Sequence, residues 1–183
     1  MRDGGGQRSY LTVSHDGRTL YSIADEGVVS FRILPNGGLA RLNRASIKGM
    51  RGCHLATDEE DKFIFVSGYH DGKETTLRLN PDGSVGEIAD KVFHKGLGSV
   101  AERNFRPHIS CTRRTPDGKF LMVADLGIDQ VKIYDSTGIR EPDAGGCPAL
   151  RAGICSQTVY FQPGRKIFLF NVPVKEYHRR VQL

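Results

Sequence analysis

Five residues with chemically useful side chains lie in two parts of the chain: His54 and His70, and further along Glu102, Arg103 and His108. A neutral histidine can act as a general base near pH 7, and a glutamate can orient a base or carry a proton. An arginine binds anions and stabilises negative charge that develops in a transition state. These residue types together suit general base catalysis on an anionic substrate.

Each of these residues also has a plainer interpretation. A single histidine beside the start of a strand, such as His54 or His70, is more often a turn or edge residue than a catalyst. The adjacent Glu102 and Arg103 are equally compatible with an exposed ion pair on a solvated loop. His108 differs because it ends a long irregular stretch, and loops of this kind often carry function. From the residue types alone, both interpretations stay open.

The elements that must position these side chains are predicted to be strands. Short alternating apolar runs, separated by Gly, Asp, Asn and Pro, fill the first 136 residues, and no segment has a 3.6-residue apolar period. This pattern is typical of an all-β protein. The predicted strands are Tyr10–Val13, Thr19–Ile23, Val28–Ile33, Cys53–Thr57, Lys62–Ser67, Thr75–Leu79, Lys119–Ala124 and Gln130–Tyr134.

A repeated turn sets the architecture. Asp16, Asp61 and Asp117 each lie in a turn that precedes a strand, at a spacing near 45 residues, with one longer insertion before Pro107. One four-stranded sheet per repeat of this length is the spacing of a β-propeller. We therefore predict an all-β, partial β-propeller of about three four-stranded antiparallel blades over residues 1–136, followed by an irregular tail over residues 137–183.

Composition limits the class of protein. The net charge is +5, but the tail from Thr137 onward holds seven Lys/Arg and three Asp/Glu, so the predicted blades carry only +1. This distribution predicts no nucleic-acid partner. The chain has no long apolar run and no apolar leader, which predicts a cytoplasmic protein without a membrane partner. Four cysteines without CxxC spacing predict neither a metal site nor a disulfide framework.

Several strings of this sequence resemble the seven-bladed β-propeller lactonases, the family of bacterial 6-phosphogluconolactonases. The strings are SYLTVSHDGRTLYSIADE, CHLATDEEDKFIFVSGYHDG, LNPDGSVGE, HKGLGSVAERNFRPH and, most specifically, PDGKFLMVADLGIDQVKIY. The resemblance extends from Ser9 to about Ser136. Members of the family are longer, so the resemblance implies that blades are missing at both ends.

The resemblance implies a function and a site. It implies ring-opening hydrolysis of 6-phosphogluconolactone or a related sugar lactone, in carbohydrate metabolism, without a metal or other cofactor. By the family pattern, His108 is the candidate base, Arg103 the anchor or oxyanion donor, and Glu102 the residue that orients either, while His54 and His70 are candidate substrate-binding residues. The family's further Arg and acid would follow residue 136 and are absent, so we expect little or no activity from this incomplete copy. The alternative is a non-enzymatic propeller fragment that binds a partner or self-associates through open sheet edges.

The tail departs from the family after Tyr134. Read one base further along, residues 154–167 can encode SAPRQFIFSPDGKY and residues 175–182 can encode RNTIDVYS, both of which resemble the next blade. This predicts a frameshift after about residue 136, and the alternative is a divergent tail. A second departure is the segment HISCTRR at 108–114, where Ser110 replaces an expected histidine and two arginines replace apolar strand residues.

Overall fold

The structure, a computed structural model, describes residues 10–98 and 106–136, together with the strand segments 150–152, 158–162 and 166–170. It contains three four-stranded antiparallel sheets and one two-stranded hairpin. The first sheet contains β1 (Leu11–Val13), β2 (Thr19–Ala24), β3 (Gly27–Ile33) and β4 (Leu39–Ser46). The second contains β5 (His54–Thr57), β6 (Phe63–Gly68), β7 (Lys73–Leu79) and β8 (Val85–Phe93). The third contains β9 (Ile109–Arg114), β10 (Phe120–Asp125), β11 (Gln130–Asp135) and β12 (Leu150–Ala152), and the hairpin contains β13 (Thr158–Gln162) and β14 (Lys166–Phe170).

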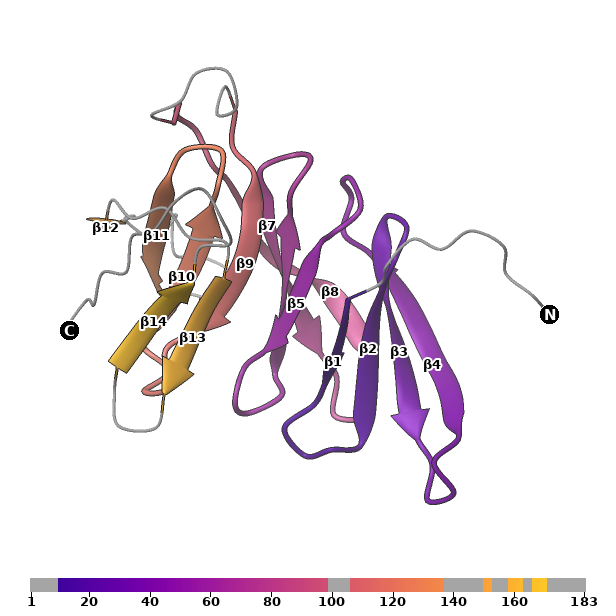
Figure 1. Ribbon diagram of the computed structural model, residues 1–183. Helices are drawn as coiled ribbons and strands as arrows, with labels where there is room; N and C mark the ends of the chain where they lie inside the picture. Colours follow the sequence, from indigo (N-terminus) through magenta and orange to yellow (C-terminus); the bar gives the residue numbers. More distant parts are fainter. Residues whose placement is uncertain (1–9, 99–105, 137–149, 153–157, 163–165, 171–183) are drawn as a thin grey trace.

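The three sheets follow one another as blades (Figure 1). Within each sheet the strands pair in the order of the sequence, and the first strands β1, β5 and β9 lie beside one another. The hairpin strand β13 contacts β9 and β10. This arrangement confirms the predicted all-β partial propeller, with side chains from different blades meeting where the first strands adjoin.

The predicted strands agree with the structure, each within two residues at either end. Three strands of the first 136 residues were not predicted, namely β4, β8 and β9. β4 and β8 are largely exposed, so neither has the apolar alternation that marks a half-buried strand. The tail was predicted to be irregular, yet it contributes three short strands, of which β12 completes the third sheet by pairing with β11.

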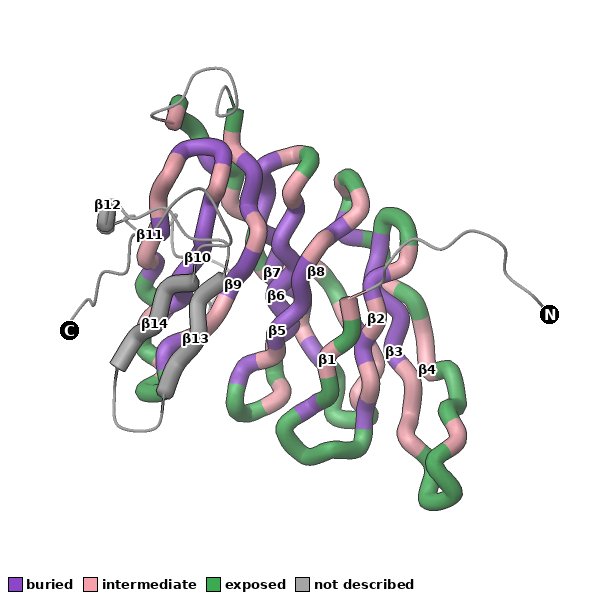
Figure 2. Tube along the Cα trace, in the orientation of Figure 1, coloured by how far each residue is buried: buried purple, intermediate pink, exposed green. Residues whose placement is uncertain are grey.

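Apolar side chains fill the spaces between neighbouring blades. Figure 2 shows in purple where the buried residues lie along the chain. The first cluster joins the first two sheets and includes Tyr21, Ile23, Val28, Leu55, Ile64, Val66 and Leu77. The second joins the second and third sheets and includes Ala56, Phe65, Ile109, Leu121, Val123 and Tyr134. Burying one such large side chain contributes on the order of 2 kcal/mol, so these clusters fix each blade against the next.

The turns lie at the two ends of the strands. We call these ends the lower edge and the upper edge by their place in Figure 1, as distinct from the outermost strands of a sheet. The lower edge consists of the β1–β2, β3–β4, β5–β6, β7–β8 and β9–β10 turns. The upper edge consists of the β2–β3, β6–β7 and β10–β11 turns, the β4–β5 connection, the end of β8 and the beginning of β9. His54, His70 and His108 all belong to the upper edge, since each lies at the beginning of a first strand or in the β6–β7 turn.

Candidate active site

His108 lies directly before β9 and is held on three sides. Its Nδ1 is 2.8 Å from the backbone carbonyl oxygen of Tyr69, and its ring stacks on the Tyr69 ring at 4.5 Å between centroids. Its backbone N–H donates to Asp125 Oδ1 at 2.7 Å. Because a carbonyl oxygen can only accept, Nδ1 carries a proton, and in the neutral ring the lone pair is on Nε2. This is the tautomer that a general base acting through Nε2 requires.

His54, the first residue of β5, is buried against β9. Burial, followed by the positive charge of Arg113, lowers the pKa of His54 to about 3, so the imidazole is neutral at physiological pH. The backbone N–H of Thr112 donates to its Nδ1 at 3.5 Å, Cys111 Sγ lies 3.6 Å from Nε2, and the Tyr10 ring packs 4.5 Å away. These contacts are those of a packed neutral histidine, and a contact of His54 with substrate stays a prediction.

His70 is exposed in the β6–β7 turn. Its ring meets the Tyr69 ring edge-on at 5.5 Å, so Tyr69 contacts both His70 and His108. The structure therefore brings two of the predicted histidines to one tyrosine, while His54 contacts β9 further along the strand. Glu102 and Arg103 lie outside the described residues, and their roles stay predictions.

Two functional candidates, His94 and Asp125, were missed by the sequence analysis. Both side chains are fully buried, and His94 Nδ1 lies 2.6 Å from Asp125 Oδ2. Burial lowers the pKa of His94 against the opposing effect of this hydrogen bond, so the pair is a neutral histidine that donates to a carboxylate. The other oxygen of Asp125 accepts from the backbone N–H groups of His108 and Gly127, at 2.7 and 2.9 Å. The only sequence signal was an aspartate at the end of an apolar strand.

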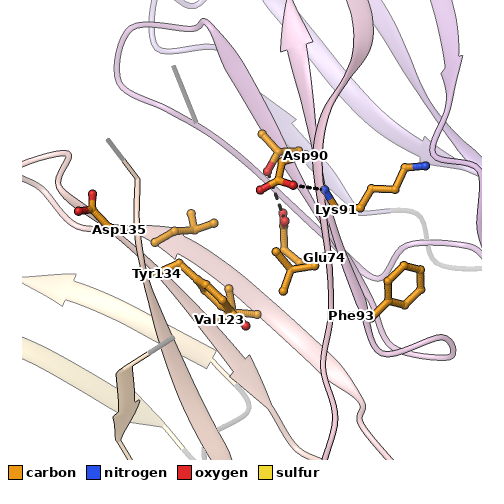
Figure 3. Close-up of a pocket in the computed structure, with 10 residues that line it drawn as sticks. Glu74, Asp90, Lys91, Phe93, Val123, Tyr134 and Asp135 are labelled. Atoms are coloured by element: carbon orange, nitrogen blue, oxygen red, sulfur yellow. Dashed lines mark hydrogen bonds between the residues drawn. The ribbon is translucent and has the colours of Figure 1, made fainter. Parts of the chain in front are cut away.

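A cavity of about 230 Å³ lies between the second and third sheets (Figure 3). Glu74, Asp90 and Tyr134 line it, and the three histidines above do not. Burial raises the pKa of Glu74 to about 8, and its Oε1 has no hydrogen-bond partner within the described part of the chain. The cavity is thus a separate feature from the histidine-bearing upper edge.

Among the described residues, no group of three or more His, Cys, Asp or Glu side chains is arranged to hold a metal ion. Within the same ranges, no helix has the length and apolar character needed to cross a membrane.

Comparison with known proteins extends these observations. A family model described as "Lactonase, 7-bladed beta-propeller" matches residues 2–151. The 6-phosphogluconolactonase of Bacillus subtilis is 31% identical over 134 residues, which is 70% of this chain and 38% of that protein. A crystal structure from Bacteroides fragilis, provisionally named a 6-phosphogluconolactonase, is 27% identical with a TM-score of 0.75, over 95% of this chain and 55% of that one.

The fold likeness reaches a more distant protein as well. The periplasmic gluconolactonase of Pseudomonas aeruginosa is 21% identical, with a TM-score of 0.78 over 95% of this chain and 56% of that one. At this identity the likeness concerns the fold alone. In these three comparisons the match covers between 38% and 56% of the other protein, so this chain corresponds to about half of its relatives or less.

Proposed function

Because the chain belongs to the seven-bladed β-propeller lactonase family, we propose that it carries part of the active site of a lactone hydrolase that acts on 6-phosphogluconolactone or a related sugar lactone. The likeness to the Bacillus subtilis 6-phosphogluconolactonase supports this choice of substrate. The proposed activity is hydrolysis of a cyclic ester by water.

The observation that carries the proposal is the hydrogen bond between His108 Nδ1 and the Tyr69 carbonyl oxygen. It leaves Nε2 able to take a proton from water as the water attacks the lactone carbonyl carbon. Negative charge then develops on the carbonyl oxygen, and Arg103 is the proposed donor to that oxygen or the anchor of a phosphate group. Glu102 is the proposed partner that orients either group. Collapse of the tetrahedral intermediate breaks the ring C–O bond. The ring oxygen that leaves takes the proton that His108 accepted from water, which gives the open sugar acid and restores the base.

The test uses the purified full chain. We expect 6-phosphogluconate, the ring-opened product, to bind measurably in calorimetry, and we expect any rate of lactone opening above the spontaneous rate to depend on His108. His108→Gln keeps a polar side chain but removes the base, so it is expected to abolish that excess rate. No binding of the product together with a spontaneous rate of ring opening in the unmodified chain would reject the proposal.

A second candidate function, a non-enzymatic module that self-associates, is favoured by one observation. Leu11 and Val13 are two residues apart on β1, so they point to the same side of the sheet, and their side chains are 55% and 47% exposed. Exposed apolar residues on an edge strand favour pairing with another chain. The proposed partner is a second copy of this chain, joined along β1.

Light scattering on the full chain separates the two candidates. A concentration-dependent dimer that Leu11→Ser with Val13→Ser disrupts, in a protein without lactonase activity, would support the self-association candidate. A monomer at all concentrations would reject it.

A further inference from the structure

Asp125 connects two points of the chain that are far apart in the sequence. Its Oδ2 accepts from His94 Nδ1 at 2.6 Å, and its Oδ1 accepts from the backbone N–H of His108 at 2.7 Å. His94 directly follows β8 and His108 directly precedes β9. A single carboxylate therefore binds both ends of the connection that separates the second and third sheets.

The carboxylate is more than a turn-forming group. An asparagine at position 125 could accept from the N–H groups of His108 and Gly127 through its single oxygen, without the cost of burying a charge. Only a carboxylate also presents a second acceptor to His94. A fully buried carboxylate is expensive unless it is paired, and within the described ranges no Lys or Arg forms an ion pair with Asp125. A bond to a neutral histidine is the compensation that the structure shows.

His94 itself is not placed to act on a substrate. Its side chain is fully buried and its ring stacks on Tyr134 at 6.0 Å. Among the residues that the structure describes, its Nε2 has no hydrogen-bond partner. The acceptor Asp125 selects the tautomer in which Nδ1 carries the proton. His94 and His108 therefore share the same tautomer, and both are buried, with 5% and 8% of the residue exposed.

We propose that Asp125 and His94 form a positioning pair for His108. The pair fixes the backbone from which the His108 ring projects and brings the end of β8 to the beginning of β9. In this arrangement Asp125 acts on the base through the main chain, while Tyr69 acts on the ring. The inference rests on the proposed function, in which His108 is the base.

The experiment records ¹⁵N spectra of the histidine rings and the affinity for 6-phosphogluconate in the full chain. In the unmodified protein we expect both His94 and His108 to carry the proton on Nδ1. Asp125→Asn replaces one carboxylate oxygen by an amide N–H₂ group. At least one of the three donors, His94 Nδ1 and the backbone N–H groups of His108 and Gly127, then loses its acceptor. We expect the His94 tautomer to change and the His108 ring signals to move. The product affinity is expected to fall on the order of tenfold, which is the lower end of the effect when a histidine in a binding site loses the group that orients it.

Two further variants separate positioning from stability. Asp58→Asn is the matched control, because Asp58 is also a buried carboxylate that accepts two backbone N–H bonds, but at the lower edge. It is expected to lower the melting temperature without moving the His108 signals or the product affinity. His94→Asn keeps an N–H near the position of Nδ1 and is expected to restore most of the affinity that His94→Leu loses.

The outcomes are distinguishable. If Asp125→Asn changes His94 but leaves the His108 signals as in the unmodified chain, the positioning role is wrong. If the unmodified chain neither binds the product nor opens the lactone, the proposed function is wrong, and the ring spectra still decide whether the pair controls His108. If Asp58→Asn moves the His108 signals as much as Asp125→Asn does, the effect is one of general stability and the inference fails.

Discussion

The two edges of the blades use buried carboxylates in different ways. At the lower edge, Asp58 accepts from the backbone N–H groups of Lys62 and Phe63, both at 2.7 Å, and pairs with Arg114 of the next blade at 3.4 Å. At the upper edge, Asp125 also accepts two backbone N–H bonds, but its other partner is a neutral histidine. Both carboxylates join two blades, but the lower one pairs with a cation, and the upper one binds a neutral histidine and the backbone of a candidate base.

This difference indicates where a functional site can be placed on a fold built from repeated blades. The lower turns repeat from blade to blade, since in each one a side-chain oxygen accepts from the backbone N–H five residues later. The acceptors are Ser14, Asp58 and Thr115. A contact that recurs in every blade serves the architecture that all blades share. The upper edge does not repeat in this way, because His94 and His108 flank a long connection without a counterpart between the first two sheets. Irregular connections on a regular scaffold are where binding groups can be placed without loss of the core.

The largest effect that tests this comparison is expected from Asp58→Ala. The substitution leaves two backbone N–H groups without their acceptor and Arg114, which is largely buried, without its counter-ion. Breaking a buried pair of this kind costs about 3 kcal/mol or more. Chemical denaturation of the full chain should show this loss in the free energy of unfolding.

The same variant should leave binding at the upper edge intact. Its affinity for 6-phosphogluconate, measured where the protein is still folded, is expected to equal that of the unmodified chain. Arg114→Met, which removes the charge but keeps a long side chain, is the partner control and should cost less. A selective loss of product binding in Asp58→Ala would break the division between the two edges.

The lower edge was largely predictable from the sequence, because its information is local. Gly17 and Gly118 have φ values of 71° and 68°, and a Gly after a turn aspartate signals this left-handed conformation directly. Thr115 and Asp117 close their turn with a side-chain hydrogen bond of 2.6 Å within three residues. Turns of this kind therefore indicated the repeat, and the length of the repeat predicted the propeller.

The upper edge was only partly predictable, because its contacts join distant residues. The sequence indicated His108, but the bond between His94 and Asp125 spans 31 positions and leaves no local pattern. β9 was missed because Arg113 and Arg114 interrupt its apolar run. The structure places Arg114 in the ion pair with Asp58, while Arg113 Nε is buried and has no hydrogen-bond partner among the described residues.

That a frameshift after about residue 136 produced the tail stays a prediction. The backbone of the β13–β14 hairpin lies against β9 and β10, beside the third blade. Resequencing the coding region and reading the adjacent frame would decide between a frameshift and a divergent tail. A stop codon within the adjacent frame over residues 154–182 would reject the frameshift.

Acidification is expected to lower the free energy of unfolding by a smaller amount, through histidines of the upper edge. The pKa of His54 is lowered from 6.5 to about 3 in the folded chain, so between these values the unfolded chain binds more protons. Stability is therefore lost as the pH falls from about 6.5 toward 3, by about 2 kcal/mol at pH 5. The lowered pKa of His94 acts in the same direction. Denaturation at pH 7 and pH 5 measures the difference.

His54→Gln is the control for the acid effect. It cannot titrate in this range, so its stability should change less between pH 7 and pH 5 than that of the unmodified chain. Equal losses in both proteins would mean that the acid sensitivity comes from groups other than His54. The buried neutral histidine of the upper edge would then not be its source.

The smallest effect is expected at Asp61, which links the lower turns of the first two blades. Its carboxylate accepts from the backbone N–H groups of His15 and Asp16, at 2.9 and 3.0 Å, and its own φ is 51°. These hydrogen bonds are exposed to water, so their loss in Asp61→Ala, with the strain of alanine at positive φ, should cost about 1 kcal/mol.

Asp61→Asn separates the two causes, because asparagine tolerates the left-handed conformation and keeps one acceptor oxygen. It is expected to lose less stability than Asp61→Ala, with faster hydrogen exchange at the amides of the first blade's turn in both variants. Because the carboxylate and its donors belong to neighbouring blades, this exchange reports how firmly one lower turn holds the next. Exchange that is unchanged in Asp61→Ala would show that the apolar clusters alone align the blades, and the lower edge would then be a set of independent turns rather than a connected seam.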